Sequence, residues 1–359
     1  MVIQNSCRPI HYTFLSVLFQ LILTSVLGLF PAVGQETNPY RIEVLDGSRE
    51  LLFSQDKYWE KATFSYNKVI KLSNKKWYMW YTSWKTLKGG DYNGHLCFAH
   101  SENGKDWVKE IPGETEKNNN IIFGSGNGRN DGVVEPDVFL NRHDRKFPFR
   151  MIFTAKDSSD RMKEKTFMMK SANGYRWVDR KVIWAHKHDS QFSVTPLKHN
   201  YRVDLRMWDT VGTKRYRTVG TATIRPDGST LMPQKQILSV YRYAPFTDIY
   251  NSASSKLRKG DYLFLPTLWD PAYDRIAIVS AFSVNGTINL DTTDLTRLLF
   301  DKQVGWATVS PGIISTGKRG EYWIYYIGRS ESHDSKAPIG MSAYYRIKIK
   351  IIKAGRPFH

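Results

Sequence analysis

The chain has 359 residues, with 52 Lys and Arg against 34 Asp and Glu, so its formal net charge is +18. It contains only two cysteines, Cys7 and Cys97, and the first lies in the N-terminal leader described below. An internal disulfide is therefore excluded in the mature chain, which is long enough to be stabilised by a hydrophobic core. The positive charge favours a polyanionic partner, such as an acidic or sulfated glycan or the cell envelope, over nucleic acid, although it also fits a role in solubility alone.

Residues 1–34 are predicted to be a signal peptide. A weakly basic start precedes an uncharged run, Phe14 to Phe30, and the small residues Ala32-Val33-Gly34 suit cleavage before Gln35. The alternative is an uncleaved membrane anchor, for which the run is near the short limit. We expect residues 35–359 to form a single secreted or periplasmic domain.

Two sequence patterns repeat within that domain. The first is S-x-N-G-x-x-W, which occurs at Ser101–Trp107 and at Ser171–Trp177, with shorter versions at Asn285-Gly286 and Asp227-Gly228. Asn-Gly and Asp-Gly between apolar runs are strong hairpin signals, because both turn positions can take a positive φ. The pattern therefore predicts recurring hairpins.

The second repeated pattern is an aromatic and apolar run that follows a polar turn. Its five copies are Trp77–Thr82, Phe149–Thr154, Val203–Trp208, Asp261–Pro266 and Glu321–Tyr326. A shorter apolar run precedes each turn, so the repeating unit is strand, turn, aromatic strand, linker, strand, Asn-Gly turn, strand. This unit is a four-stranded antiparallel blade, and five of them fit residues 35–359.

We therefore predict an all-β fold, a five-bladed β-propeller. Closing such a ring often requires strands from both termini, and the tail Tyr344 to Ile351 is expected to pair with Arg41 to Leu45. The alternative is an irregular β-sandwich. Leu295 to Phe300 is the best candidate for a short helix.

The stretch Gly132 to Leu140 carries two acids at the start of a predicted strand. Alternation is expected to put Glu135 and Asp137 on one face of the strand. Pro136 cannot donate to a sheet ladder, so both acids should lie among the first residues of the strand. A carboxylate beside apolar surface loses hydration, and its pKa can move into a useful range.

In a propeller the innermost strands run toward a shared central funnel, and their first residues line one mouth of it. Residues just before or within the predicted innermost strands are therefore candidates for a site. As catalytic acids we predict Glu135, Asp189, Asp248 and Asp137. As substrate-binding residues we predict Trp59, Tyr66, Asn67, Gln191, Tyr250, Asn251, Trp306 and Ser310.

Such a ring of acids suits glycoside hydrolysis. One carboxylic acid protonates the leaving oxygen and another carboxylate attacks the sugar or activates water. Glu135 is the expected general acid, Asp189 and Asp248 its expected partners, and Asp137 a reserve. Each acid alone is equally well explained as a turn cap or as a hydrogen-bond acceptor at a strand edge.

These motifs resemble those of the five-bladed β-propeller glycoside hydrolases, which include arabinanases, xylosidases, invertases and levansucrases. The resemblance is carried by Glu135–Phe139, by the Ser-x-Asn-Gly-x-x-Trp turns, by Asp248–Asn251, and by Gly305-Trp306 with Ser310–Gly312. It implies three essential carboxylates, typically one from each of the first three blades. The chain lacks the Asn-Asp-Pro-Asn-Gly, Arg-Asp-Pro and Glu-Cys stretches of those families, and Glu60 is the candidate left in the first blade.

We expect a carbohydrate partner, acidic or sulfated on the charge argument, and a monomer. No cofactor is expected, a structural calcium is not indicated, and membrane contact is expected only through an uncleaved leader. His186-x-His188 offers two imidazoles on one strand face, but no metal site is predicted from them. Two other hypotheses stay open: a non-catalytic glycan-binding propeller, and a polyanion-binding or envelope-associated protein.

Overall fold

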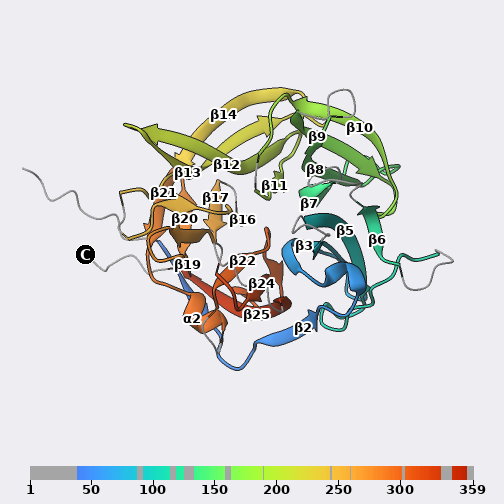
Figure 1. Ribbon diagram of the computed structural model, residues 1–359, viewed down its shortest axis with the longest axis horizontal. Helices are drawn as coiled ribbons and strands as arrows, with labels where there is room; N and C mark the ends of the chain where they lie inside the picture. The colour runs from blue at the N-terminus through green and yellow to red at the C-terminus, as the bar shows by residue number, and fades with distance from the viewer. Residues whose placement is uncertain are drawn as a thin grey trace, which may run out of the picture. The chain divides into compact units, whose positions relative to one another are not determined.

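The computed structural model describes residues 39–86, 92–113, 119–124, 133–157, 163–188, 190–242, 245–258, 260–300, 304–332 and 342–353. The predicted signal peptide and Asp189 lie outside the described residues. Residues Tyr40–His359 make one compact unit, and its sheets stand around a central axis (Figure 1). Within the described part of the chain, no helix has the length and apolar character needed to cross a membrane.

The first three sheets each contain four antiparallel strands in chain order. The first has β3 (Thr63–Ser73), β4 (Lys76–Thr86), β5 (Tyr92–Ser101) and β6 (Ile121–Gly124); the second has β7 (Val134–Leu140), β8 (Phe149–Lys156), β9 (Glu164–Ser171) and β10 (Trp177–Trp184); the third has β11 (Ser193–Pro196), β12 (Tyr201–Val211), β13 (Lys214–Ile224) and β14 (Thr230–Leu238). The lowest-numbered strand of each sheet lies nearest the axis (Figure 1).

The fourth sheet is interrupted across its width. One part contains β15 (Asp248–Ile249), β18 (Thr267–Asp270) and β19 (Arg275–Ile278), and the other contains β16 (Ser254–Arg258), β17 (Asp261–Phe264), β20 (Ser280–Val284) and β21 (Thr287–Asp291). Backbone bonds continue through the interruption, because Tyr250 N donates to Thr267 O at 2.8 Å and Leu265 N donates to Ala253 O at 3.3 Å. The two parts therefore act as one blade.

The fifth sheet joins the two ends of the unit. From the axis outward it contains β22 (Trp306–Val309) and β23 (Ile314–Ser315), then β24 (Glu321–Arg329) and β25 (Ser342–Lys353), and on the outside β1 (Tyr40–Val44) and β2 (Glu50–Ser54). β1 pairs antiparallel with β25 in the register Ile42 to Ile351. This confirms the predicted pairing of the C-terminal tail with the N-terminal strand.

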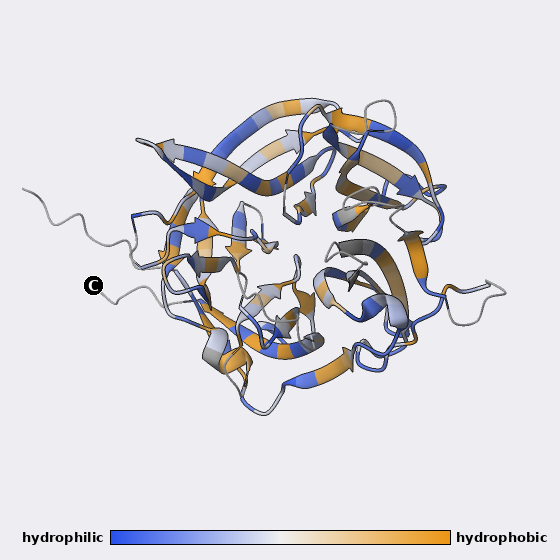
Figure 2. Cartoon of the chain, in the orientation of Figure 1, coloured by the Kyte–Doolittle hydropathy of each residue, from blue (hydrophilic) through white to orange (hydrophobic). Residues whose placement is uncertain are grey.

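Five hydrophobic clusters fill the spaces between adjacent sheets, and the second strands explain how. In β4, Trp77, Met79 and Tyr81 belong to the cluster shared with the fifth sheet. The alternate residues Tyr78 and Trp80 belong to the cluster shared with the second sheet. A strand buried on both faces requires an almost continuous apolar run, which is why the five aromatic runs mark the five second strands. Apolar and polar segments accordingly alternate along the chain in Figure 2.

The repeated Ser-x-Asn-Gly turns fasten each sheet to the preceding one. Ser101 Oγ accepts a bond from Gly104 N at 2.9 Å, and Ser171 Oγ accepts one from Gly174 N at 2.8 Å. In the first copy Tyr325 of the fifth sheet donates to Gly104 O at 3.0 Å. In the second, Trp80 Nε1 of the first sheet donates to Gly174 O at 2.6 Å.

The turn prediction was correct in place but only partly in geometry. At Asn285-Gly286 both residues have positive φ, 51° and 87°, as the two-residue hairpin requires. At the two longer motifs positive φ is found at Gly104 and Gly174, while Asn103 and Asn173 accept backbone N–H bonds through their side chains. Among the described residues, helical structure comprises η1 (Tyr58–Glu60) and α2 (Thr296–Leu299), and α2 matches the predicted short helix.

Candidate functional site

The first residues of the innermost strands meet around the axis at one end of the ring. We call this set of residues the mouth: Tyr66, Glu135, Ser190, Arg206, Tyr250 and Trp306. They come from all five sheets. Tyr66 lies on β3, Glu135 on β7, Arg206 on β12 and Trp306 on β22, while Ser190 precedes β11 and Tyr250 follows β15. The phenol of Tyr66 interacts electrostatically with Glu135, Arg206 and Tyr250 and forms a hydrogen bond with Ser190. The ring of Tyr250 makes an edge contact with Trp306, with centroids 4.3 Å apart.

Tyr66 is a buried phenol with a strongly raised pKa. Burial is the main cause, and the negative charge of Glu135 raises the pKa further, against the opposing effects of Arg206 and Ser190. Tyr66 is therefore neutral at physiological pH. Its hydroxyl keeps its proton and forms a hydrogen bond with Ser190.

Glu135 is the predicted acid that the structure places in the mouth. It has a positive φ of 53°, and the pairing of β7 with β8 shifts register between Val134 and Asp137. A bulge of this kind breaks the alternation of side chains along a strand. The side chain is partly exposed, as a residue that meets a substrate must be.

The expectation that Glu135 and Asp137 share one face was wrong, because the bulge lies between them. Asp137 is fully buried; its Oδ1 lies 2.9 Å from Lys68 Nζ, and its Oδ2 accepts a bond from Val194 N at 2.5 Å. Burial raises the pKa of Asp137, while Lys68 and the backbone N–H groups oppose that shift. Asp137 thus links the innermost strands β3, β7 and β11, and the structure does not bring it to the surface of the mouth.

Asp248 is also engaged in holding two sheets together. It accepts hydrogen bonds from Arg217 N and from Thr247 Oγ1, each at 2.8 Å, and lies 3.7 Å from a guanidinium nitrogen of Arg217. These contacts join β15 of the fourth sheet to β13 of the third. Of the predicted acids, then, Asp137 and Asp248 have structural partners, Glu135 lies in the mouth, and Asp189 is not described.

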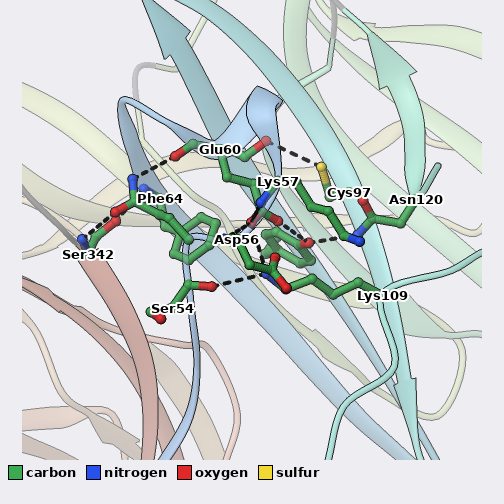
Figure 3. Close-up of polar contacts among 12 residues, drawn as sticks. Ser54, Asp56, Lys57, Glu60, Phe64, Cys97, Lys109, Asn120 and Ser342 are labelled. Carbon is green, nitrogen blue, oxygen red and sulfur yellow. Dashed lines mark hydrogen bonds and ion pairs between the residues drawn. The ribbon is translucent and has the colours of Figure 1, made fainter. Parts of the chain in front are cut away.

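Glu60, the candidate from the first sheet, lies in a polar cluster with Asp56 and Lys109 (Figure 3). Its Oε2 lies 2.8 Å from Lys109 Nζ and accepts bonds from Asp56 N and Lys57 N, while its Oε1 accepts the hydroxyl of Tyr81 at 2.7 Å. The side chain is fully buried and all of its bonds are internal. Glu60 therefore stabilises the junction between η1 and the first sheet.

Four predicted substrate-binding residues form a polar plug beneath the mouth: Asn67, Gln191, Asn251 and Ser310. Gln191 Nε2 donates to Asn67 O at 2.9 Å and to Pro136 O at 3.0 Å, and Ser310 Oγ donates to Asn67 O at 2.9 Å. Asn251 Nδ2 donates to Val309 O at 3.0 Å. All four side chains are buried, so they connect the innermost strands and support the residues above them.

The predicted aromatic residues divide between the mouth and the core. Tyr250 and Trp306 lie in the mouth, and Tyr66 lies beside the acid. Trp59, predicted to stack on a sugar, is instead buried in the cluster between the first and fifth sheets, among residues that include Phe64. The turn η1 carries it into that cluster together with Glu60.

Sequence reasoning missed the basic residues of this end of the ring. The guanidinium of Arg206 lies 4.7 Å from the ring centroid of Tyr250. Arg217 lies 4.9 Å from the Tyr250 ring, 4.9 Å from the Trp208 ring and 5.4 Å from the Trp269 ring. Second strands run antiparallel to the innermost ones, so their last residues return to the same end of the ring. That rule would have identified Arg206, Trp208 and Trp269.

The two histidines named in the sequence are held by other contacts. Gln234 Nε2 lies 3.2 Å from the Nε2 atoms of His186 and of His188, and His188 Nδ1 lies 3.1 Å from Arg206 O. Among the described residues no group of three or more His, Cys, Asp or Glu could hold a metal ion. His188 instead supports the backbone of Arg206.

Among the described residues, the mouth and the adjacent Arg217 therefore combine one partly exposed carboxylate with a neutral phenol, two guanidinium groups and several aromatic rings. The carboxylate can transfer a proton, the phenol and guanidinium groups can donate hydrogen bonds, and the rings offer faces on which a sugar can stack. Cationic donors also favour a ligand that carries negative charge.

No protein-family model matches the chain, and no curated protein matches it in sequence. Solved structures match in fold. An N-acetylgalactosamine deacetylase from F. plautii, in complex with blood group B trisaccharide, has a TM-score of 0.56 at 9% identity, covering 87% of this chain and 95% of that one. A β-1,2-mannobiose phosphorylase from Listeria innocua, in complex with β-1,2-mannobiose, has a TM-score of 0.52 at 9% identity, covering 84% and 92%. An α-L-arabinofuranosidase from Lactobacillus brevis has a TM-score of 0.50 at 9% identity, covering 78% and 89%. The chain therefore shares its fold with these three proteins, in agreement with the all-β propeller that the sequence predicts.

Proposed function

We propose that this protein is a secreted glycan-active enzyme that hydrolyses glycosidic bonds at the mouth, with Glu135 as the general acid. The observation that carries the proposal is the position of Glu135, a partly exposed carboxylate at the start of an innermost strand that interacts electrostatically with the buried phenol of Tyr66. Protonation of the leaving oxygen requires an acid at such a place. The predicted partner carboxylate is Asp189.

The surroundings of Glu135 support this role. Tyr66 is kept neutral by burial, so it donates a hydrogen bond without competing for the negative charge that develops during bond cleavage. Ser190 Oγ donates to Tyr250 O at 2.6 Å, and this bond holds the third and fourth sheets together at the mouth. A preorganised group of donors around the acid contributes to transition-state stabilisation.

The substrate we propose is a poly- or oligosaccharide that carries a carboxylate or a sulfate. Arg217 supports this, because its guanidinium lies among three aromatic rings with 21% of the side chain exposed. A planar cation flanked by rings suits a sugar with an anionic substituent, since the sugar face can stack while its charge is neutralised.

The test is Glu135→Gln, which keeps the shape of the side chain and removes the titratable proton. Reducing ends released from neutral and uronate-containing oligosaccharides should fall by about 10²–10⁴-fold in kcat, the range that general acid–base catalysis contributes. The melting temperature should stay the same, because Glu135 is partly exposed. Glu43→Gln, on the outermost strand β1, is the matched control. Unchanged turnover in Glu135→Gln would overturn the assignment of the acid.

A second function, non-catalytic glycan binding, is favoured by one specific observation: Asp137, Asp248 and Glu60 are all engaged in internal contacts. On this hypothesis the protein binds oligosaccharides in a glycan array and releases no reducing ends. A polyanion-binding protein would instead show steep salt dependence without a sugar preference. The same assays, repeated at two salt concentrations, separate the three outcomes.

A further inference from the structure

A cavity lies at the opposite end of the ring from the mouth. It has a volume of about 770 Å³ and is lined by the last residues of the innermost strands of all five sheets. We call it the basal pocket and define it by Lys68, Lys71, Arg142, Lys256, Ser255 and Ile313, which line it together with neighbouring residues. Cavities of this size commonly hold small ligands.

The lining of the basal pocket is basic and contains no carboxylate. Lys68, Lys71, Arg142 and Lys256 contribute cations, His143 contributes an imidazole, and no Asp or Glu is present in the lining. Lys68 is partly neutralised by Asp137, which lies behind it. Lys71, Arg142 and Lys256 are exposed, and within the described residues none of them forms an ion pair with a carboxylate. Three cations that lack a carboxylate partner therefore line one cavity, and one of them, Lys71, also lies with its Nζ 5.2 Å from the centroid of the Trp77 ring.

The walls between these cations are suited to a sugar. The hydroxyl-bearing residues Thr195, Tyr201, Ser255 and Ser315 line the cavity together with the apolar residues Val194, Leu197 and Ile313. Ser254 also lines it, but its hydroxyl donates to Asp204 Oδ2 at 2.6 Å. Hydroxyl groups can bond sugar hydroxyls, and apolar side chains can pack against a ring face. An inorganic anion would use the cations but would leave most of this cavity without a contact.

The basal pocket is separate from the mouth. The polar plug of Asn67, Gln191, Asn251 and Ser310 is buried between the two ends of the innermost strands. Below it, the ion pair of Lys68 with Asp137 ties β3 to β7. A ligand in the basal pocket therefore has no contact with Glu135.

We propose that the basal pocket is a second, non-catalytic binding site for an anionic saccharide, one that carries carboxylate or sulfate groups. The charge of the lining selects the anion, and the hydroxyl and apolar walls select the sugar. The choice of a saccharide over other anionic molecules rests in part on the proposed function. Such a site would hold an enzyme on an acidic polysaccharide while the mouth acts on a chain end.

The experiment is calorimetric titration of the folded chain with an oligouronate, a sulfated oligosaccharide, a neutral oligosaccharide of equal length, and inorganic sulfate and phosphate. The double variant Lys71→Glu/Lys256→Glu should weaken binding of the anionic oligosaccharides by about tenfold or more. Raising the salt from about 50 to about 500 mM should weaken it as well. The neutral oligosaccharide should show no change between the wild type and this variant.

The matched control is Arg225→Glu/Lys235→Glu, which makes the same charge change on exposed residues of the third sheet, outside the lining. It should bind like the wild type. Should the double variant fail to fold, Arg142→Glu alone tests the same lining from an exposed turn. Glu135→Gln should retain binding at the basal pocket, so loss of turnover and loss of this site can be distinguished.

Two results would overturn the proposal. One is binding by Lys71→Glu/Lys256→Glu that equals binding by the wild type, because the cations of the pocket would then not hold the ligand. An equal loss of binding in the control variant would count in the same way, because binding would then depend on the overall charge of the protein and not on the pocket. The other is binding of inorganic sulfate or phosphate as tight as that of the oligosaccharides, because the walls would then contribute nothing.

Discussion

The mouth and the interior directly below it each contain a carboxylate of β7, but the carboxylate in the mouth is partly exposed and the one below it is a buried structural group. Glu135 and Asp137 are two residues apart on β7, yet the first is partly exposed and the second is fully buried. Glu135 and Arg206 both act electrostatically on the phenol of Tyr66, whereas Asp137 is bound by Lys68 and by Val194 N. The difference shows that the backbone, and not the residue type, decides which carboxylate is available for chemistry.

The physical reason is the bulge at the start of β7. Without it, alternation would place both acids on one face, where two adjacent buried charges would repel. With Glu135 in the left-handed region, Glu135 stays partly exposed while Asp137 makes its contact with β11. Lys68 then compensates the buried charge of Asp137.

The sharpest test of this comparison is Asp137→Ala beside Glu135→Gln. Asp137→Ala leaves Lys68 buried without its partner and removes the acceptor of Val194 N, so we expect a loss of about 3–5 kcal/mol in the free energy of unfolding. Chemical denaturation measures it. Glu135→Gln should change this free energy by less than about 0.5 kcal/mol. Equal destabilisation by both variants would contradict the separation of roles.

A second test concerns the turns that join the sheets. Gly104 has a φ of 73°, and an added Cβ would lie 2.7 Å from Tyr325 Oη and 2.9 Å from the Trp77 ring. Gly286 has a φ of 87°, and its Cβ would meet nothing within 4 Å. Gly286→Ala should cost about 1 kcal/mol from backbone strain, and Gly104→Ala a further 1–3 kcal/mol, roughly, from overpacking. Equal melting temperatures for the two variants would show that the turn does not clamp the fifth sheet to the first.

A third test concerns the contact that fastens β1 to the fourth sheet. Tyr40 Oη donates to Asp261 Oδ2 at 2.8 Å, and Arg258 also bonds this carboxylate. Burial alone would raise the pKa of Asp261, but the bonds from Arg258 and Tyr40 outweigh it and lower the pKa. Burial and the bond to Asp261 raise the pKa of Tyr40.

The signs define a pH window for this contact. Asp261 contributes to the free energy of unfolding above its unfolded pKa, near 4, and this contribution is lost as the pH falls through its lower folded pKa. Tyr40 contributes below its unfolded pKa, about 10, and this contribution is lost as the pH rises through its higher folded pKa. Tyr40→Phe should cost about 1.5–3 kcal/mol at neutral pH. Its deficit relative to the wild type should shrink at both extremes in denaturation curves measured across pH. A constant deficit would contradict the coupling.

Much of the fold could be predicted from the sequence. The five aromatic runs mark strands buried on both faces, and this requirement is local enough to be visible in Trp77–Thr82 or Glu321–Tyr326. The Ser-x-Asn-Gly turns and the alternating tail are equally local. The mouth was predicted less well, because only the innermost strands were followed and Arg206, at the end of a second strand, was missed.

The sequence by itself determined the strand pattern, the turns and the closure of the ring, since each depends on side-chain periodicity and on residues that tolerate positive φ. Only the tertiary structure decided which acid is accessible. The bulge beside Glu135, the pairing of Asp137 with Lys68 and the enclosure of Glu60 by Lys109 and Tyr81 all depend on contacts between residues distant in the chain. A carboxylate's role is set by what surrounds it, and that is a property of the assembled sheets.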